Sequence, residues 1–334
     1  KVTSGHGAVL ADIATRHGRD VATAYQRAND AGFAQLSALV GSLPEDVGWT
    51  TSPHIVYSTN EASFPRLRTT AVLAMDAGSA IARSDPPRWA KGEAWAWGQS
   101  ALVQPVSLAR ALGRALQTAG VPVVEHARVV DVLDAASLPR VRLEDGREVR
   151  GRDVLIATHS PIHDPGGHAL RMAVYRHAAI AARVDVDDVP SSYNIDGMST
   201  RPVTLGDGSR GAVIVGPSRR TGSITPAAWS DVQVWASGAL KSGPPTHRWA
   251  AQDLRTFDLL PFVGRTRRSP HVLVTTGLNG WGFTNAAAVA FNWSLSRRRA
   301  NFATGSKPAR RAHSAKWSSR RPSAPSSLSE ASGD

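Results

Sequence analysis

The pattern of apolar and polar positions predicts a chain that begins with helix. Residues 6–40 favour two helices with a break at residues 16–18, because apolar side chains recur at helical spacing on both sides of a glycine. A further helix is predicted over residues 105–117, where three leucines share one face. Residues 54–57 and 69–75 lean toward strand and are predicted to form short β pieces.

Strand-like patterns dominate from residue 121 onward. Residues 121–133 and 140–159 contain predicted strands, with Asp145-Gly146 as a tight hairpin turn. A second β-rich region over residues 172–234 is predicted to form a separate antiparallel sheet. The last periodic stretch predicts a buried strand, a glycine-rich turn, and a helix that begins near residues 281–284.

The composition favours a globular protein with a basic end. The chain has 334 residues, 42% of them hydrophobic, which is ample for a sizeable core. Nine basic residues but only two acidic ones lie within residues 297–334, a stretch rich in serine, alanine and proline, so we predict a disordered basic tail there. The tail holds Trp317 without the interleaved aromatic residues that stack bases. No specific nucleic-acid partner is therefore predicted, and nonspecific attraction of anions stays open.

The absence of cysteine excludes disulfides, thiolate nucleophiles and cysteine-ligated zinc or iron–sulfur centres on this chain. No run approaches the roughly 20 apolar residues of a membrane span, and the first residues do not resemble a secretory signal. We therefore expect no membrane span and a cytoplasmic protein.

The strongest chemical signal is the glycine-rich turn between the last predicted strand and helix. Gly277, Gly280 and Gly282 would let backbone approach a ligand closely where a helix begins, with free amides and the positive helix end facing it. Such a site suits the pyrimidine edge of a flavin, where negative charge develops on reduction, and it suits phosphate equally. The alternative is a tight turn that only packing requires.

Two other patterns do not predict sites. The G-x-G-x-x-G formed by Gly206, Gly208 and Gly211 lies between two strand-like runs, so it is interpreted as a hairpin turn rather than a dinucleotide loop. The histidines within residues 159–168, together with Asp164, are interpreted as solvated loop residues, and no metal site is predicted. The sequence has no phosphate-loop, zinc-protease or nucleophile-elbow motif, so it does not indicate a nucleotide triphosphatase, a zinc protease or a hydrolase.

Several segments, in order, resemble the flavin oxidoreductases related to D-amino-acid oxidase, glycine oxidase and sarcosine oxidase, and among these the proteins similar to gamma-glutamylputrescine oxidase. The opening KVTSGHG and the later ATRHG and AYQRAND resemble the piece that follows the first nucleotide-binding unit. The middle section is similar in QPVSLARALGRAL, VVEHARVVDV and DVLIATHSPIHD. The carboxyl-terminal signature is similar in HRWAAQDLRTFDLLPFVGR and, most specifically, TTGLNGWGFTNAAA.

The resemblance implies FAD as cofactor and, as partners, a small amine or amino-acid substrate and oxygen or another electron acceptor. It implies oxidation of a C–N bond by hydride transfer to flavin N5. The cofactor-binding residues that it implies are Lys1, Val2, Thr3, Gly5, His6, Gly7, Arg128, Val129, Ala157, Thr158, Gly277, Asn279, Gly280, Trp281, Gly282, Phe283 and Thr284. The candidates for the substrate side of the flavin are Trp249 and Trp281, and plain core packing is the alternative for both.

The implied fold is mixed α/β, with an incomplete FAD-binding Rossmann-like domain interleaved with an antiparallel-sheet substrate domain. Residues 1–45, 99–160 and 262–296 are assigned to the FAD-binding domain, and residues 46–98 and 161–261 to the substrate domain. We expect the first βαβ unit, with its G-x-G-x-x-G loop, to be absent, which would impair FAD binding. The alternative function is that of a non-catalytic fragment that binds anions or a protein partner.

Overall fold

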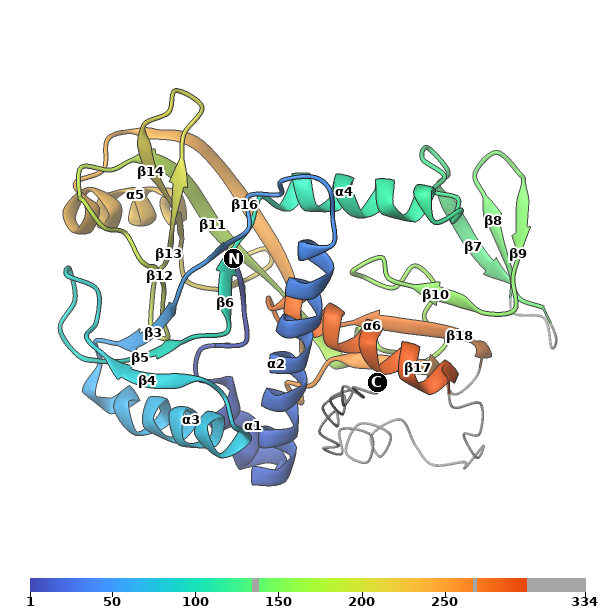
Figure 1. Cartoon of the computed structure of the whole chain (residues 1–334), viewed down its shortest axis with the longest axis horizontal. Coiled ribbons are helices and arrows are strands. Elements are labelled where there is room, and N and C mark those ends of the chain that lie inside the picture. Colours follow the sequence, from blue (N-terminus) through green and yellow to red (C-terminus); the bar gives the residue numbers. More distant parts are fainter. Residues whose placement is uncertain (134–137, 267–268, 299–334) are drawn as a thin grey trace, which may run out of the picture.

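The computed structural model describes residues 1–133, 138–266 and 269–298, with side chains up to Phe291 in the last helix. A large sheet occupies one side of the molecule, with helices at both of its ends, and small sheets lie on the other side together with further helices (Figure 1). The helices are α1 Val9–His17, α2 Arg19–Gly41, α3 Phe64–Ala77, α4 Pro105–Thr118, α5 Ala227–Leu240 and α6 Gly282–Arg298, with short 3-10 turns at Glu61–Ser63 and Ala169–Arg171.

Most of the predicted helices form where the periodicity places them. Gly18 adopts a φ of 87° between α1 and α2, a conformation that a glycine tolerates, so the predicted break is confirmed. The prediction of a β piece over residues 69–75 is wrong, because those residues belong to α3. Pro65 is accepted in the first turn of α3. Leu67, Ala71 and Ala74 form the buried face of this helix, although the local sequence resembles a strand.

The large sheet has nine strands. It runs in the order β15-β11-β14-β13-β12-β3-β5-β4, with β16 on the other edge of β11, and all pairs are antiparallel except β12 with β3. Its strands are β3 His54–Ser58, β4 Ile81–Ser84, β5 Glu93–Trp97, β11 Met172–Arg183, β12 Ser191–Asn194, β13 Ser199–Thr204, β14 Arg210–Val215, β15 Arg219–Arg220 and β16 Pro245–Thr256. The glycine motif near residue 208 is the turn between β13 and β14, so the hairpin interpretation is confirmed.

Helix α5 covers one face of this sheet. Val232 and Ala236 of α5 pack with Ala178, Ile180 and Ile214 in a fully apolar cluster. Alternate residues of β11 and β14 therefore face α5, and the residues between them face the opposite side of the sheet. This alternation decides which side chains of β11 and β16 are available to a ligand.

The remaining described strands form three small sheets, of which β1-β6-β2 lies beside the large sheet and the other two lie beyond α2 (Figure 1). One has the order β10-β18-β17, another β1-β6-β2, and the third β7-β8-β9. Their strands are β1 Val2–Thr3, β2 Thr50–Thr51, β6 Ser100–Leu102, β7 Val129–Leu133, β8 Arg140–Leu143, β9 Glu148–Arg150, β10 Val154–Ile156, β17 Phe262–Thr266 and β18 Ser269–Thr276. The predicted hairpin at Asp145-Gly146 joins β8 to β9, with Gly146 at a φ of 86°.

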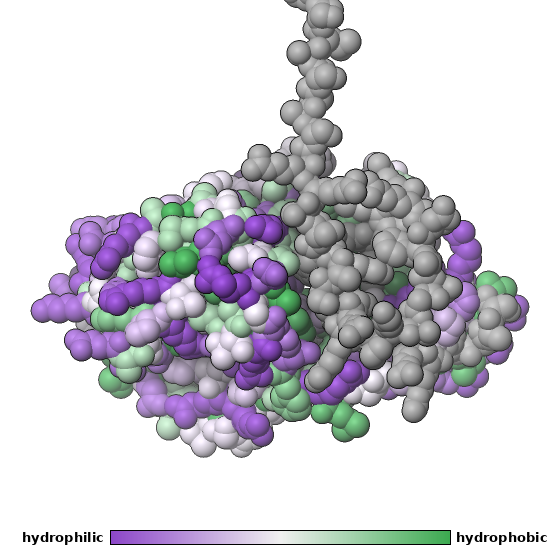
Figure 2. Space-filling model, turned by 90° about the horizontal axis from the view of Figure 1, so that it is seen from below, coloured by the Kyte–Doolittle hydropathy of each residue, from purple (hydrophilic) through white to green (hydrophobic). Residues whose placement is uncertain are grey.

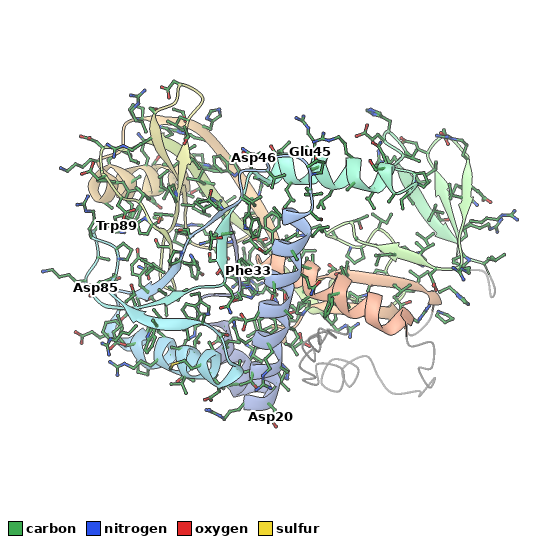
Figure 3. All side chains as sticks on the ribbon, in the orientation of Figure 1. Asp20, Phe33, Glu45, Asp46, Asp85 and Trp89 are labelled. Carbon is green, nitrogen blue, oxygen red and sulfur yellow. The ribbon has the colours of Figure 1, made fainter. Side chains whose placement is uncertain are left out.

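Helix α2 runs between the two sides of the molecule (Figure 3). It begins beside Asp20, carries Phe33 at its middle, and leads into the loop that holds Glu45. Arg114 of α4 pairs with Glu45, and the ring of Phe33 lies 5.9 Å from that of Trp49. These contacts fix α4 across the carboxyl end of α2.

The mixed α/β fold is thus confirmed, while the predicted domain boundaries stay a prediction. One core cluster joins Leu10 and Tyr25 of the predicted FAD-binding domain to Val56, Leu67 and Trp97 of the predicted substrate domain. The two parts are therefore interleaved in packing as well as in sequence.

The outer surface mixes polar and apolar residues on the described part of the face shown in Figure 2. Among the described helices, none is long and apolar enough to span a membrane. The predicted basic tail falls outside the described residues, except for Arg297 and Arg298 at the end of α6.

Candidate cofactor and substrate site

The candidate site starts at the edge where two parallel strands end. β10 and β18 pair in parallel, with Ile156 opposite Val274, so the residues that follow both strands emerge at one edge. In open α/β sheets, ligands bind outside this carboxyl edge. The hydroxyl of Thr276 donates to the carbonyl of His159, which brings the predicted residues Ala157 and Thr158 beside the glycine turn.

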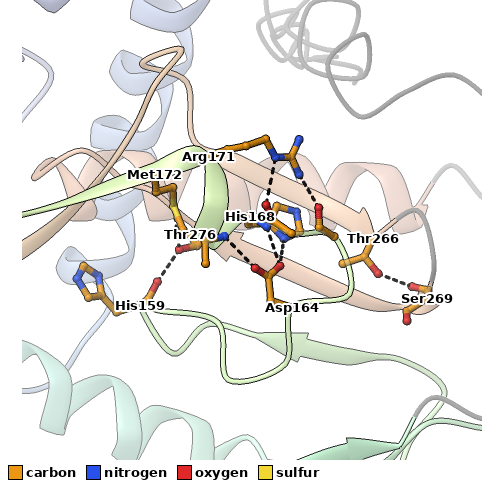
Figure 4. A network of polar contacts seen from close by, with 11 residues as sticks. His159, Asp164, His168, Arg171, Met172, Thr266, Ser269 and Thr276 are labelled. Atoms are coloured by element: carbon orange, nitrogen blue, oxygen red, sulfur yellow. Dashed lines mark hydrogen bonds and ion pairs between the residues drawn. The ribbon is translucent and has the colours of Figure 1, made fainter.

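A polar network fixes the loop beyond β10 (Figure 4). The carboxylate of Asp164 accepts hydrogen bonds from the amides of His168 and Ala169, both at 2.8 Å, and lies 2.6 Å from His168 Nδ1. Burial acts to raise the pKa of Asp164, but these hydrogen bonds outweigh it and hold the pKa below its usual value. Interpreting all the loop histidines as solvated is wrong for His168, whose residue is 6% exposed.

The glycine turn itself is anchored to the end of β16. Asn279 has a φ of 56°, its side-chain oxygen accepts from the amide of Thr256 at 2.9 Å, and its side-chain nitrogen donates to the carbonyl of Leu259 at 2.9 Å. A Cβ on Gly277 would lie 2.4 Å from Thr256, so packing requires that glycine. A Cβ on Gly282 would meet its nearest neighbour at 3.9 Å, so that position is open.

Helix α6 begins at the open end of this turn. Its first backbone bond runs from Asn285 to the carbonyl of Trp281, so the preceding amides have no intrahelical acceptor and the positive helix end is available to a ligand. A cavity of about 1090 Å³ lies beside it. The cavity is lined by Lys1, Thr3, Gln35, Leu36, Leu39, Pro105, Leu108, Ala109, Leu112, Arg201, Gly280, Trp281, Gly282, Phe283, Thr284, Ala286, Ala287, Ala290 and Phe291.

A buried histidine ties the opening segment to α6. His6 Nε2 lies 3.0 Å from the carbonyl of Thr3 and 2.9 Å from the hydroxyl of Thr284, and Nδ1 lies 2.8 Å from the hydroxyl of Tyr25. Because a carbonyl can only accept, Nε2 carries the proton and Nδ1 accepts from Tyr25. Burial lowers the pKa of His6 to about 3, although its bond to Thr3 opposes this. The ring also stacks on Trp281 at 4.7 Å, so His6 supports the turn as a neutral imidazole.

Two cations lie at the cavity. Lys1 Nζ donates to the hydroxyl of Ser199 at 3.0 Å and to the carbonyl of Ser192 at 3.2 Å, and it lies 3.4 Å from a ring nitrogen of His54. Burial, and then the charge of Arg201, lower the pKa of Lys1, and burial lowers that of Arg201. Within the described residues, neither side chain forms an ion pair with a carboxylate.

The floor of the site comes from the large sheet. The ring of Tyr193 meets Trp281 edge-on at 5.6 Å, and a Cβ on Gly7 would lie 2.6 Å from it. Arg255 of β16 lies over the ring of Tyr175 of β11, at 4.5 Å. Burial raises the pKa of Tyr193, so its phenol stays neutral. The sheet thus contributes aromatic walls beside the turn.

The structure brings most of the predicted residues to one place. Lys1, Thr3 and residues 280–284 line the cavity, whereas Val2, Gly5, His6 and Gly7 lie behind it, with Gly5 closely packed on Trp97. These roles stay predictions.

Three predicted residues lie apart from the cavity lining. Arg128 and Val129 sit at the β7–β8 hairpin, where Arg128 pairs with Glu144 in solvent. Trp249 of β16 is exposed and is not among the residues that line the cavity. Tyr25, Tyr193 and Arg201 were missed by sequence reasoning, because nothing in their local sequence marks them.

Comparisons with known proteins agree with this architecture. The sequence profile of the FAD dependent oxidoreductase family, DAO, matches residues 3–291. Glycine oxidase from Geobacillus kaustophilus is similar in structure, with a TM-score of 0.69 and 18% identity over 82% of this chain and 79% of its own. L-proline dehydrogenase from P. horikoshii has a TM-score of 0.69 and 14% identity, covering 84% and 80%. Iminodiacetate oxidase from Chelativorans sp. BNC1 has a TM-score of 0.63 and 16% identity, covering 86% and 82%.

A relative of known sequence is the Bacillus subtilis protein YhfW, described as a Rieske 2Fe-2S iron–sulfur protein. It is 23% identical over 298 residues, which are 87% of this chain, and the chain spans 58% of that protein's length. The fold and the profile together define the family, whose description is that of FAD dependent oxidoreductases. The chain belongs to the DAO family of FAD dependent oxidoreductases, and FAD is the cofactor of that family.

The residues at the cavity fit such a cofactor. An ammonium, a guanidinium and the start of a helix converge on a space of about 1090 Å³, which is at the upper end of ligand-pocket volumes, roughly 300–1,000 Å³. These hydrogen-bond donors suit an anionic or electron-rich edge of the cofactor. Lys1, Arg201 and the first amides of α6 are the groups that would hold it.

Proposed function

We propose that this chain, with FAD bound, oxidises the C–N bond of an amine or amino acid. The observation that carries the proposal is the convergence of the Thr3–His6 segment, the start of α6 and the half-buried cations Lys1 and Arg201 on one cavity next to the sheet floor. Similar structures named glycine oxidase and iminodiacetate oxidase support a small amine or amino acid as the substrate class.

FAD, when bound, supplies the group that accepts a hydride from the substrate carbon. The protein's own part is to hold the amine close, in the right orientation and out of water. Trp281 and Tyr193 form aromatic walls, and a dry aromatic wall favours the neutral amine over the ammonium at the moment of reaction. Loss of the hydride from the neutral amine gives an iminium cation, and water hydrolyses this cation to a carbonyl compound and ammonia or an amine.

Oxygen or another electron acceptor would then take the electrons. The similar structures include both oxidases and a dehydrogenase, so either acceptor is compatible with the fold. The cytoplasmic location stays a prediction, and cell fractionation tests it.

The test of the cofactor site uses two matched glycines. Gly282 begins α6 at the cavity and Gly238 lies in α5, and neither has an atom close enough to clash with an added Cβ. In Gly282→Val the new side chain would enter the cavity, so we expect FAD affinity to fall at least about tenfold, or about 1.4 kcal/mol. Gly238→Val should leave FAD affinity unchanged.

FAD binding is measured by titration of the FAD-free protein, followed through flavin fluorescence. Turnover is measured as amine-dependent oxygen consumption or dye reduction by the FAD-loaded protein. Equal FAD affinity in the two glycine variants would show that the cavity is not the cofactor site. An FAD-loaded protein that oxidises no amine or amino acid would refute the proposed reaction.

A further inference from the structure

The sheet floor carries an ionisable pair that the reaction as proposed does not use. β11 and β16 are paired antiparallel over eleven residue pairs, with Tyr175 opposite Asp253 and His177 opposite Ala251. Because successive side chains alternate between faces, Tyr175, His177 and Asp253 share the face that α5 does not cover. Asp253 lies at the end of this face nearest the glycine turn.

Asp253 is held by a histidine whose two nitrogens both face oxygen acceptors. His177 Nδ1 lies 3.1 Å from the carbonyl of Gly216, to which it must donate, and Nε2 lies 3.4 Å from a carboxylate oxygen of Asp253. The carbonyl of Gly216 fixes the orientation of the ring, which places Nε2 against the carboxylate of Asp253. His177 therefore limits the positions that this carboxylate can take.

The neighbouring arginine does not neutralise this carboxylate. Arg255 follows two residues later on the same face, yet its guanidinium lies over Tyr175 and its hydrogen bond goes to Ser218 at 3.5 Å. Among the described residues, no ion pair joins Arg255 to Asp253. The Asp253 side chain stays 30% exposed, so one side of its carboxylate is open to a ligand.

The carboxylate also lies beside the turn that lines the cavity. A Cβ on Gly280 would lie 3.3 Å from an Asp253 oxygen, and Gly280 is itself a cavity residue. Trp281 follows directly and faces Tyr193. An anionic group therefore sits where an aromatic wall, the glycine turn and the sheet floor meet.

We propose that Asp253 is the counter-ion for the ammonium form of the substrate, and that His177 is the residue that positions it. The proposal rests on the proposed function and narrows its substrate class to primary and secondary amines that bind as cations. Each bound ammonium then releases one proton to water, which leaves the neutral amine that loses the hydride. Charge-assisted hydrogen bonds from an ammonium to a half-buried carboxylate are about twice as strong as neutral ones, so this contact discriminates against uncharged isosteres.

The experiment uses a probe that the enzyme cannot oxidise. tert-Butylamine has no hydrogen on the carbon that bears nitrogen, and it is a cation at neutral pH, as alkyl amines of the lysine type are. tert-Butanol is its neutral isostere. We expect the FAD-loaded protein to bind the amine at least about tenfold more tightly than the alcohol in calorimetric titrations.

Four variants then test whether Asp253 causes the tighter binding of tert-butylamine. Asp253→Asn should abolish the tenfold difference, Asp253→Glu should keep part of it, and His177→Gln should reduce it. Asp231→Asn is the matched control, since Asp231 lies on α5, across the sheet, in an exposed pair with Arg219. Circular dichroism and FAD content check that each variant is folded.

A preference that survives unchanged in a folded Asp253→Asn protein would overturn the inference. Absence of any preference in the unmodified protein would overturn it equally. Where an oxidisable amine is found, Asp253→Asn should raise KM by tenfold or more with a smaller change in kcat. A protein that binds the probe through Asp253 but oxidises no amine would refute the proposed reaction and leave this inference standing.

Discussion

The large sheet and the small sheets differ in how well they are covered. The cluster between α5 and the large sheet contains eleven buried residues among those described, including Ile180 and Ile214 at 0% exposure. The cluster formed by β7, β10 and β18 contains four, and Val149 and Leu155 of the small sheets are about half exposed, at 55% and 49%. Apolar burial is the main source of stability, so the large sheet is the firmer region and the small sheets are expected to open locally at lower cost.

The largest expected effect tests this comparison directly. Ile214→Ala removes fully buried methyl groups from the large sheet, and we expect it to lower the free energy of unfolding by about 2–5 kcal/mol. Leu155→Ala on β10 removes a half-exposed side chain and should cost less than about 1 kcal/mol. Urea denaturation of both variants measures the difference. Equal costs would mean that the two regions are equally well packed.

The second largest expected effect is a dependence of the free energy of unfolding on pH, caused by His6 at the junction between the two regions. His6 has a pKa of about 3 in the folded protein and the ordinary value of 6.5 when unfolded. Between these values the unfolded chain binds more protons, so stability is greatest above pH 6.5 and falls as the pH is lowered. The loss should approach about 1.4 kcal/mol per pH unit.

The control for this prediction is His6→Gln, which cannot titrate. Urea midpoints at several pH values should show a flatter dependence for this variant than for the unmodified protein. His54, whose pKa is lowered by burial, contributes in the same direction and remains in both proteins. Identical pH dependence in the two proteins would show that His6 does not contribute to the loss of stability at low pH.

The smallest effect concerns the outer hairpin. Arg128 and Glu144 form a pair at 3.5 Å whose side chains are 76% and 65% exposed. Arg128→Ala should change stability by less than about 0.5 kcal/mol, because exposed pairs are screened by water. If Arg128 contacts the adenosine through its backbone, as predicted, FAD affinity should not change either. A large loss of affinity would instead assign its side chain to the site.

Local patterns were enough to predict most elements of the fold. The break near Gly18, the helix after Pro105 and the β13–β14 hairpin all depend on residues close together in sequence. The helix α3 was missed because threonine and valine give its sequence a strand-like appearance, whereas its state is decided by burial against α1 and α2.

The site was predictable only in part, for the same reason. The turn after β18 was found because its glycines directly precede a helix. Tyr193 and Arg201 could not be found, because burial and topology bring them to the opening segment. The sequence contains only a weak indication of Asp253, because Trp249, Asp253 and Arg255 are separated by even numbers of residues and therefore lie on one face of the strand.

The pairing of β11 with β16 also decides where this protein can tolerate changes of length. Its irregularity lies between Ala181 and Ala182, at the end remote from Asp253, where one residue of β16 is passed over. An insertion in the neighbouring turn could be absorbed there. An extra residue inserted close to Asp253 would shift the register by one and move each side chain to the opposite face of the sheet. Leu254 would then take the place of the Asp253 carboxylate, and the proposed binding surface would become apolar.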